Sequence, residues 1–101
     1  MKIFISGPMT GIPDFNYTAF NAAAEKLRSI GHEVENPADN PMCDTWAAYM
    51  RLSIAQMLRC DQVVMLPGWG SSRGACIEVD LAAALDIPCA MIDVILGRHK
   101  K

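Results

Sequence analysis

The sequence offers little material for a metal centre. It has two histidines, His32 and His99, and four widely spaced cysteines that include no C-x-x-C pair. This pattern excludes a zinc knuckle, and we expect no metal site. Free thiols in a chain that starts without a secretory signal pattern are typical of a reducing compartment, so we expect a cytoplasmic protein.

Strong charge of either sign and long apolar runs are also missing. The formal net charge is -2, and the only basic cluster occupies residues 98–101, where a solvated, frayed terminus is the simplest interpretation. A protein without a broad basic field is a poor partner for a nucleic acid polymer. The longest apolar runs are too short to cross a bilayer, so we expect no membrane partner either.

The composition is that of one compact domain. Hydrophobic residues make up 51% of the 101 residues and charged residues 20%, which supplies a real core and argues against disorder. A chain of this length is close to the commonest size of a single domain. We therefore expect one domain over residues 1–101, without internal repeats.

Four short apolar runs have the character of buried strands. They are residues 2–6 (KIFIS), 32–35, 62–66 (QVVML) and 88–92, and amphipathic stretches separate them. The order βαβαβαβ predicts an α/β fold with right-handed crossovers. We expect a three-layer, Rossmann-like or flavodoxin-like parallel sheet of about four to five strands, with helices on both faces.

The intervening stretches predict three helices. The first follows Pro13, with Asp14 or Asn16 as its N-cap, and ends at Gly31. The second begins near residue 45, and the third runs from residue 71 or 72 to about residue 86. The inner stripe of the second helix is predicted to contain Trp46, Met50, Ile54, Met57 and Leu58.

Such a topology brings the loops after the strands to one edge of the sheet. These loops are residues 7–13, 36–44, 67–73 and the stretch after residue 92. The first, with its glycines and hydroxyls, lets backbone N–H groups approach an anion or a sugar, although a plain tight turn is an equal interpretation. Its candidate binding residues are Ser6, Gly7, Pro8, Met9, Thr10 and Gly11.

The third loop, P-G-W-G-S-S-R-G-A, precedes a helix N-terminus, where N–H groups and the helix dipole favour anions. Ser72 is either a phosphate ligand or an ordinary N-cap, and Arg73 is either a ligand or a solvated charge. Trp69 is either a lid or subunit contact, or a stacking surface for a base. The candidate binding residues of this loop are Gly68, Trp69, Ser72, Arg73 and Gly74.

Glu78 is the residue that composition does not explain. On a helix that starts near residue 72, it shares one face with Gly74, Leu81, Ala82 and Leu85. Burial raises the pKa of a carboxyl group unless charges or hydrogen-bond donors offset it. Glu78 is therefore either a satisfied structural acid or a tuned nucleophile or base.

Three segments carry a family resemblance: K-I-F-I-S-G-P-M-T-G, C-D-Q-V-V-M-L-P-G-W and S-R-G-A-C-I-E-V-D-L-A-A-A-L. Over nearly the whole chain the sequence resembles the nucleoside 2-deoxyribosyltransferase-like superfamily, which includes deoxynucleoside 5'-monophosphate N-glycosidases. It is most similar to a branch of short, largely uncharacterised proteins that are frequent in bacteriophage and prophage genomes.

The resemblance implies a role for several residues. Glu78 would be the nucleophile on the deoxyribose anomeric carbon, Gly74 would let the sugar approach, and Ser72 would help to hold a 5'-phosphate. Residues 7–11 would form the first substrate loop. The implied activity is cleavage or exchange of the N-glycosidic bond of a 2'-deoxynucleoside or its 5'-monophosphate, without a metal or organic cofactor.

One departure from the family pattern keeps other functions open. Ser53 stands where the superfamily typically has an aspartate, near the inward stripe of its helix. The alternatives are a nucleotide-binding or sensing module without turnover, and a structural subunit with Trp46 and Trp69 at an interface. Because a small parallel sheet leaves its end strands poorly covered, we also expect a homo-oligomer, at least a dimer.

Overall fold

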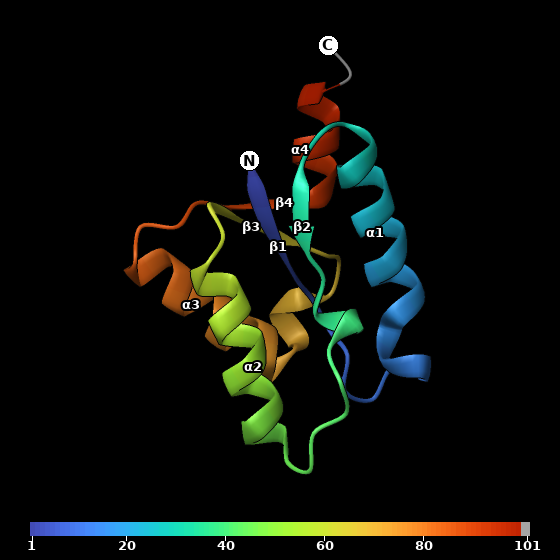
Figure 1. The fold of residues 1–101 in the computed structure, drawn as a ribbon, viewed down its shortest axis with the longest axis vertical. Coiled ribbons are helices and arrows are strands. Elements are labelled where there is room, and N and C mark those ends of the chain that lie inside the picture. The colour runs from blue at the N-terminus through green and yellow to red at the C-terminus, as the bar shows by residue number, and fades with distance from the viewer. Residues whose placement is uncertain (100–101) are drawn as a thin grey trace.

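Four parallel strands form the centre of the molecule in the computed structural model, which describes residues 1–99 (Figure 1). They are β1 (Lys2–Ser6), β2 (Glu33–Glu35), β3 (Gln62–Met65) and β4 (Cys89–Met91), in the order β2-β1-β3-β4. All three strand pairs are parallel. The predicted α/β fold with a parallel sheet is confirmed.

The alternation of side chains along β1 and β3 creates two separate cores. Ile3 and Ile5 point to one face of the sheet, and Phe4 points to the other. In β3, Val64 joins the first core and Val63 the second. Phe4 pairs with Val63 and Ile5 with Val64, so the alternation of the two strands is in register.

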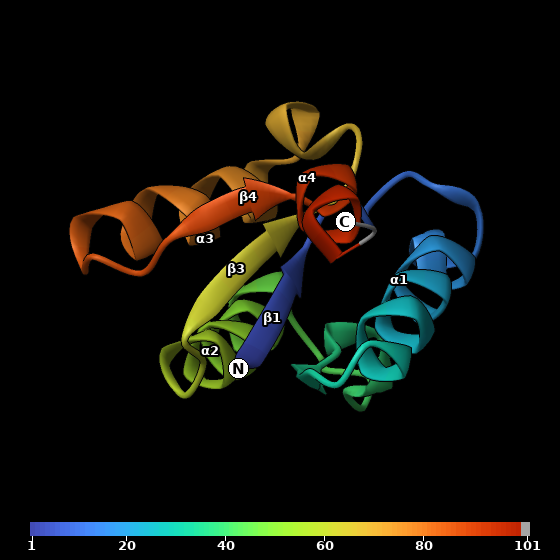
Figure 2. The same cartoon turned by 90° about the horizontal axis from the view of Figure 1, so that it is seen from above.

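Helices cover both faces and make the third layer. α1 (Tyr17–Ser29) and α4 (Ile92–His99) pack on the first core, and α2 (Trp46–Leu58) and α3 (Arg73–Ala84) pack on the second. Figure 2 shows α1 and the pair of α2 and α3 on opposite sides of the strands. None of the helices within residues 1–99 is long and apolar enough to cross a membrane.

The segment after β4 differs from the expectation. It was predicted to be a loop at the carboxyl edge of the sheet, but α4 begins immediately, at Ile92. Ile92, Ile95 and Leu96 pack against the first core, at the i, i+3, i+4 spacing of a helix face. Of the basic cluster at residues 98–101, the first two residues belong to α4, and residues 100–101 lie outside the described part of the chain.

The start of α1 also differs. Residues Pro13–Asn16 form a short 3-10 turn, in which Asp14, Phe15 and Asn16 all have positive φ angles of 53°, 50° and 62°. α1 begins only at Tyr17, and no side chain caps it. The Asn16 amide instead donates to the carbonyl of Pro8 at 3.0 Å, which ties this turn to the first loop.

The inward faces predicted for the second and third helices each include one leucine that is exposed in the structure. Leu58 at the end of α2 is 52% exposed, and Leu85 after α3 is 51% exposed. The buried stripe of α2 contains Met50 and Met57, which were predicted there, and Ser53 lies between them at helical spacings of three and four. Ser53 faces α3, where its hydroxyl donates to Glu78.

Candidate active site

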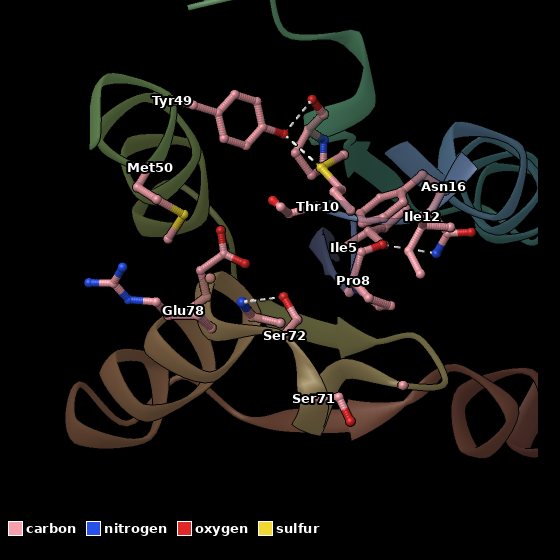
Figure 3. Close-up of a pocket in the computed structure, with 18 of the residues that line it drawn as sticks. Ile5, Pro8, Thr10, Ile12, Asn16, Tyr49, Met50, Ser71, Ser72 and Glu78 are labelled. Carbon is pink, nitrogen blue, oxygen red and sulfur yellow. Dashed lines mark hydrogen bonds between the residues drawn. The ribbon is translucent and has the colours of Figure 1, made fainter. Parts of the chain in front are cut away.

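A cavity of about 850 Å³ opens at the carboxyl edge of the strands, a volume within the range of small-molecule sites. The first loop, α2 and the start of α3 surround it, and Figure 3 shows several of the residues that line it. Most of the predicted site residues line this cavity: Gly7, Pro8, Met9, Thr10, Gly68, Ser72, Arg73, Gly74 and Glu78.

Glu78 lies at the floor of the cavity and is only 5% exposed. The Ser6 hydroxyl donates to Glu78 Oε1 at 2.7 Å, and the Ser53 hydroxyl donates to Oε2 at 2.5 Å. Both serines are buried. Each carboxylate oxygen therefore has its own hydrogen-bond donor, one from β1 and one from α2.

The local sequence explains how these three residues meet. Ser6 follows Phe4 on β1 at the strand period of two, so its hydroxyl points to the face that α2 and α3 cover. Ser53 lies on the buried stripe of α2, and Glu78 lies on the buried side of α3 with Ala82. The predicted burial of Glu78 on an otherwise apolar stripe matches its position in the structure.

The electrostatic balance at Glu78 is set by two opposing effects. Burial raises the pKa of the Glu78 carboxyl group, while the hydrogen bonds from Ser53 and Ser6 lower it, and the net shift is upward. The other titratable groups that line the cavity are Tyr49 of α2 and Arg73 of α3. A carboxylate held in this way can act as a nucleophile or as a base.

Gly74 also makes room for a neighbouring side chain. A Cβ atom at this position would lie 3.1 Å from Met50 Sδ, so the missing side chain makes room for Met50 between α2 and α3. Gly74 still lines the cavity one turn before Glu78. Its small size therefore leaves space for the Met50 side chain beside the helix that carries Glu78.

The first loop folds over the cavity and is anchored by α2. The Tyr49 hydroxyl donates to the carbonyl of Pro37 at 3.1 Å and lies 3.0 Å from Met9 Sδ. Burial raises the pKa of Tyr49, so this hydroxyl keeps its proton. Gly11 does not line the cavity; its φ of 83° serves the turn of the loop.

Of the predicted binding residues near the start of α3, Ser72 and Arg73 line the cavity and Trp69 does not. Ser72 lines the cavity and is also the N-cap of α3, because its hydroxyl accepts the N–H of Ala75 at 3.2 Å. Arg73 lies over the Trp46 ring, with its guanidinium carbon 4.4 Å from the ring centroid. Trp69, in contrast, does not line the cavity, because its half-buried ring packs against the second core.

The sequence did not predict two aromatic residues of α2 as binding residues. Trp46 and Tyr49 both line the cavity. Trp46 was expected on the inner stripe of α2, but it is 39% exposed at the cavity's rim. The sequence signal that could have identified them is that two aromatic residues, Trp46 and Tyr49, begin a helix that follows a strand-end loop.

The fold is that of the 2-deoxyribosyltransferases. The structure is similar to the 2-deoxyribosyltransferase of the psychrotolerant bacterium Bacillus psychrosaccharolyticus, with a TM-score of 0.70 and 15% identity, over 90% of this chain and 71% of that one. For the 2-deoxyribosyltransferase of Leishmania mexicana the TM-score is 0.71 and the identity 20%, over 89% of this chain and 62% of that one. The resemblance seen in the sequence is thus confirmed at the level of the fold.

The sequence also matches a family model. The model describes a domain of unknown function, DUF4406, and it matches residues 1–91. The chain therefore belongs to the DUF4406 family. A comparison with curated proteins found no match.

The first prediction concerns the stability of Glu78→Gln. Burial raises the folded-state pKa above the unfolded value of about 4.3, so wild-type protein loses stability as pH rises through the folded-state pKa. The glutamine cannot ionise, and its amide can donate to one serine while its oxygen accepts from the other. In urea unfolding, the variant should match wild type at about pH 4 and be more stable at about pH 8.

Glu25→Gln, on the exposed side of α1, is the matched control, and we expect the same pH dependence as for wild type. A Glu78→Gln protein that is less stable than wild type at about pH 8 would contradict the prediction. That result would make Glu78 a structural acid whose charge the fold requires.

Proposed function

We propose that the protein cleaves or transfers the N-glycosidic bond of a 2'-deoxynucleoside or its 5'-monophosphate, with Glu78 as the nucleophile. The observation that carries the proposal is the buried Glu78 carboxylate at the floor of a cavity, with a serine donor on each oxygen. The solved structures that share this fold are named 2-deoxyribosyltransferases, which supports the same substrate class.

In the proposed reaction a Glu78 carboxylate oxygen attacks the anomeric carbon C1' of the deoxyribose. The C1'–N bond breaks through an oxocarbenium-like transition state, and its electron pair leaves with the base. Water or a second base then displaces Glu78 from C1' and regenerates the carboxylate. The two serines hold the carboxylate in one orientation, which reduces the entropy lost on the way to the transition state.

The proposed ligand is a small nucleoside or nucleotide, and the reaction as written needs no metal or organic cofactor. Arg73 at the rim and the N-terminus of α3 supply the positive charge that a 5'-phosphate would meet. The four cysteines are free thiols, which suits the reducing cytoplasm that we propose as the location.

One observation also supports a second function. Ser53 places a neutral hydroxyl beside Glu78. A site without a second acid beside its nucleophile is also compatible with a module that binds or senses nucleotides without turning them over. The two functions share a ligand class and differ in whether free base is released.

An assay for the release of free base distinguishes the enzyme from the sensing module. Wild-type protein, incubated with a panel of deoxynucleosides and their monophosphates, should release free base that chromatography detects. Glu78→Gln should lower turnover by about 10⁴-fold or more while changing the binding affinity little, because only the attack needs the charge. Binding without base release by wild-type protein at high concentration would favour the sensing module.

Ser72→Ala tests the proposed phosphate contact. A lost hydrogen bond to a charged group costs about 1.5–3 kcal/mol, so monophosphate affinity should fall about tenfold or more while nucleoside affinity stays nearly constant. Calorimetric titration with both ligands measures the difference. The variant also removes an N-cap, so Thr45→Ala, which removes the N-cap of α2, is the matched control for stability.

Equal losses for the two ligands in Ser72→Ala would reject the phosphate assignment. Ser72 would then be only the N-cap that its contact with Ala75 already makes it.

We also propose that the protein forms a homo-oligomer, at least a dimer. β2 and β4 are the edge strands of the sheet, and Leu58 and Leu85 are exposed on the face that α2 and α3 cover. Sedimentation at micromolar concentration should show at least a dimer, and Leu58→Glu combined with Leu85→Glu should dissociate it. Val94→Glu, at an exposed position of α4, should leave it intact. A wild-type monomer would contradict the proposal.

A further inference from the structure

The cavity contains a single carboxylate. Of the residues that line it, all within residues 1–99, Glu78 is the only aspartate or glutamate. Glycosidic bonds are commonly cleaved by a pair of carboxyl groups, of which one attacks or activates water and the other protonates the leaving group. If the protein has the proposed function, a site with one carboxylate must use a substrate whose base can leave without being protonated.

The other protic groups of the cavity are poor replacements for the missing acid. The Tyr49 hydroxyl donates its proton to the carbonyl of Pro37, and burial raises its pKa. The hydroxyls of Ser6 and Ser53 donate their hydrogen bonds to Glu78 itself. Thr10, Ser71 and Ser72 are simple alcohols, which are too weakly acidic to protonate a departing base.

One further carboxylate lies nearby, outside the cavity. A hollow of about 200 Å³ adjoins the cavity and shares Met9, Thr10, Trp46 and Tyr49 with it, and Asp44 lines this hollow. Asp44 is exposed to solvent, and it makes no hydrogen bond or ion pair through its side chain among the contacts within residues 1–99. Asp44 is therefore an alternative acid that an experiment must examine.

We propose that Glu78 acts as a lone carboxylate and that the site cleaves N-glycosidic bonds to bases that already carry a positive charge, such as a purine alkylated at N7. In such a substrate the electron pair of the C1'–N9 bond neutralises the cationic ring as the bond breaks. The base departs as a neutral molecule and accepts no proton. Water then hydrolyses the glycosyl ester on Glu78, which yields the sugar, the free carboxylate and one proton released to solvent.

The charge of the site favours the same substrate class. When Glu78 is ionised, it places a negative charge at the floor of the cavity, and Arg73 places a positive charge at its rim. A nucleotide with a cationic base and an anionic 5'-phosphate can place each end next to the opposite charge. A neutral base gains less from Glu78 and also requires a proton that no group positioned in the cavity supplies.

The experiment compares 2'-deoxyguanosine with 7-methyl-2'-deoxyguanosine, each as the nucleoside and as the 5'-monophosphate. A positioned general acid contributes about 10²–10⁴-fold, so kcat/KM for the methylated substrate should exceed that for the neutral one by at least about 100-fold. Release of the base is followed by chromatography after subtraction of the spontaneous loss without enzyme. Glu78→Gln should lose the enzymatic rate on the methylated substrate.

Asp44→Asn tests whether Asp44 protonates the leaving base. If Asp44 is not the acid, the ratio of the two kcat/KM values stays the same in this variant. A ratio near one in wild-type protein, or a ratio that rises in Asp44→Asn, would overturn the inference and leave the proposed function standing. Absence of enzymatic base release from all four compounds would refute the proposed function and the inference together.

Discussion

The rest of the site depends on how the buried carboxylate of Glu78 is stabilised. Removing an ionised carboxylate from water costs far more than one hydrogen bond returns, so it needs partners on both oxygens. Ser6 and Ser53 supply them from β1 and α2, at 2.7 and 2.5 Å. Three elements that are distant in the sequence must therefore keep their register for one side chain, and the cavity forms where they meet.

Small residues set the distances that this arrangement requires. A Cβ atom on Gly74 would approach Met50 Sδ to 3.1 Å, and a Cβ atom on Gly7 would approach Leu66 Cβ to 2.9 Å. Gly74 thus leaves room for the Met50 side chain between α2 and α3, and Gly7 lets the first loop pass close to Leu66, which follows β3.

The sequence predicted those features that depend on local periodicity. The period of two in β1 and the helical stripe that holds Glu78 were both visible, and the structure contains both. The position of Ser53 near the inward stripe was predicted as well, but its bond to Glu78 required the distance between two helices. Errors arose where the pattern was short or tertiary packing decided: α4 is only eight residues long, and Trp69 faces the core because the loop turns it there.

The choice of serine at position 53 has a chemical consequence that fold similarity does not reveal. An aspartate there would place a second negative charge against Glu78, and one of the two carboxyl groups would then keep its proton as a potential acid. The neutral Ser53 hydroxyl removes that repulsion and donates to Glu78 Oε2. Serine at this position therefore favours the ionised form of Glu78 more than an aspartate would, and it supplies no second carboxyl group. This arrangement fits the proposed attack by Glu78 better than protonation of a leaving group.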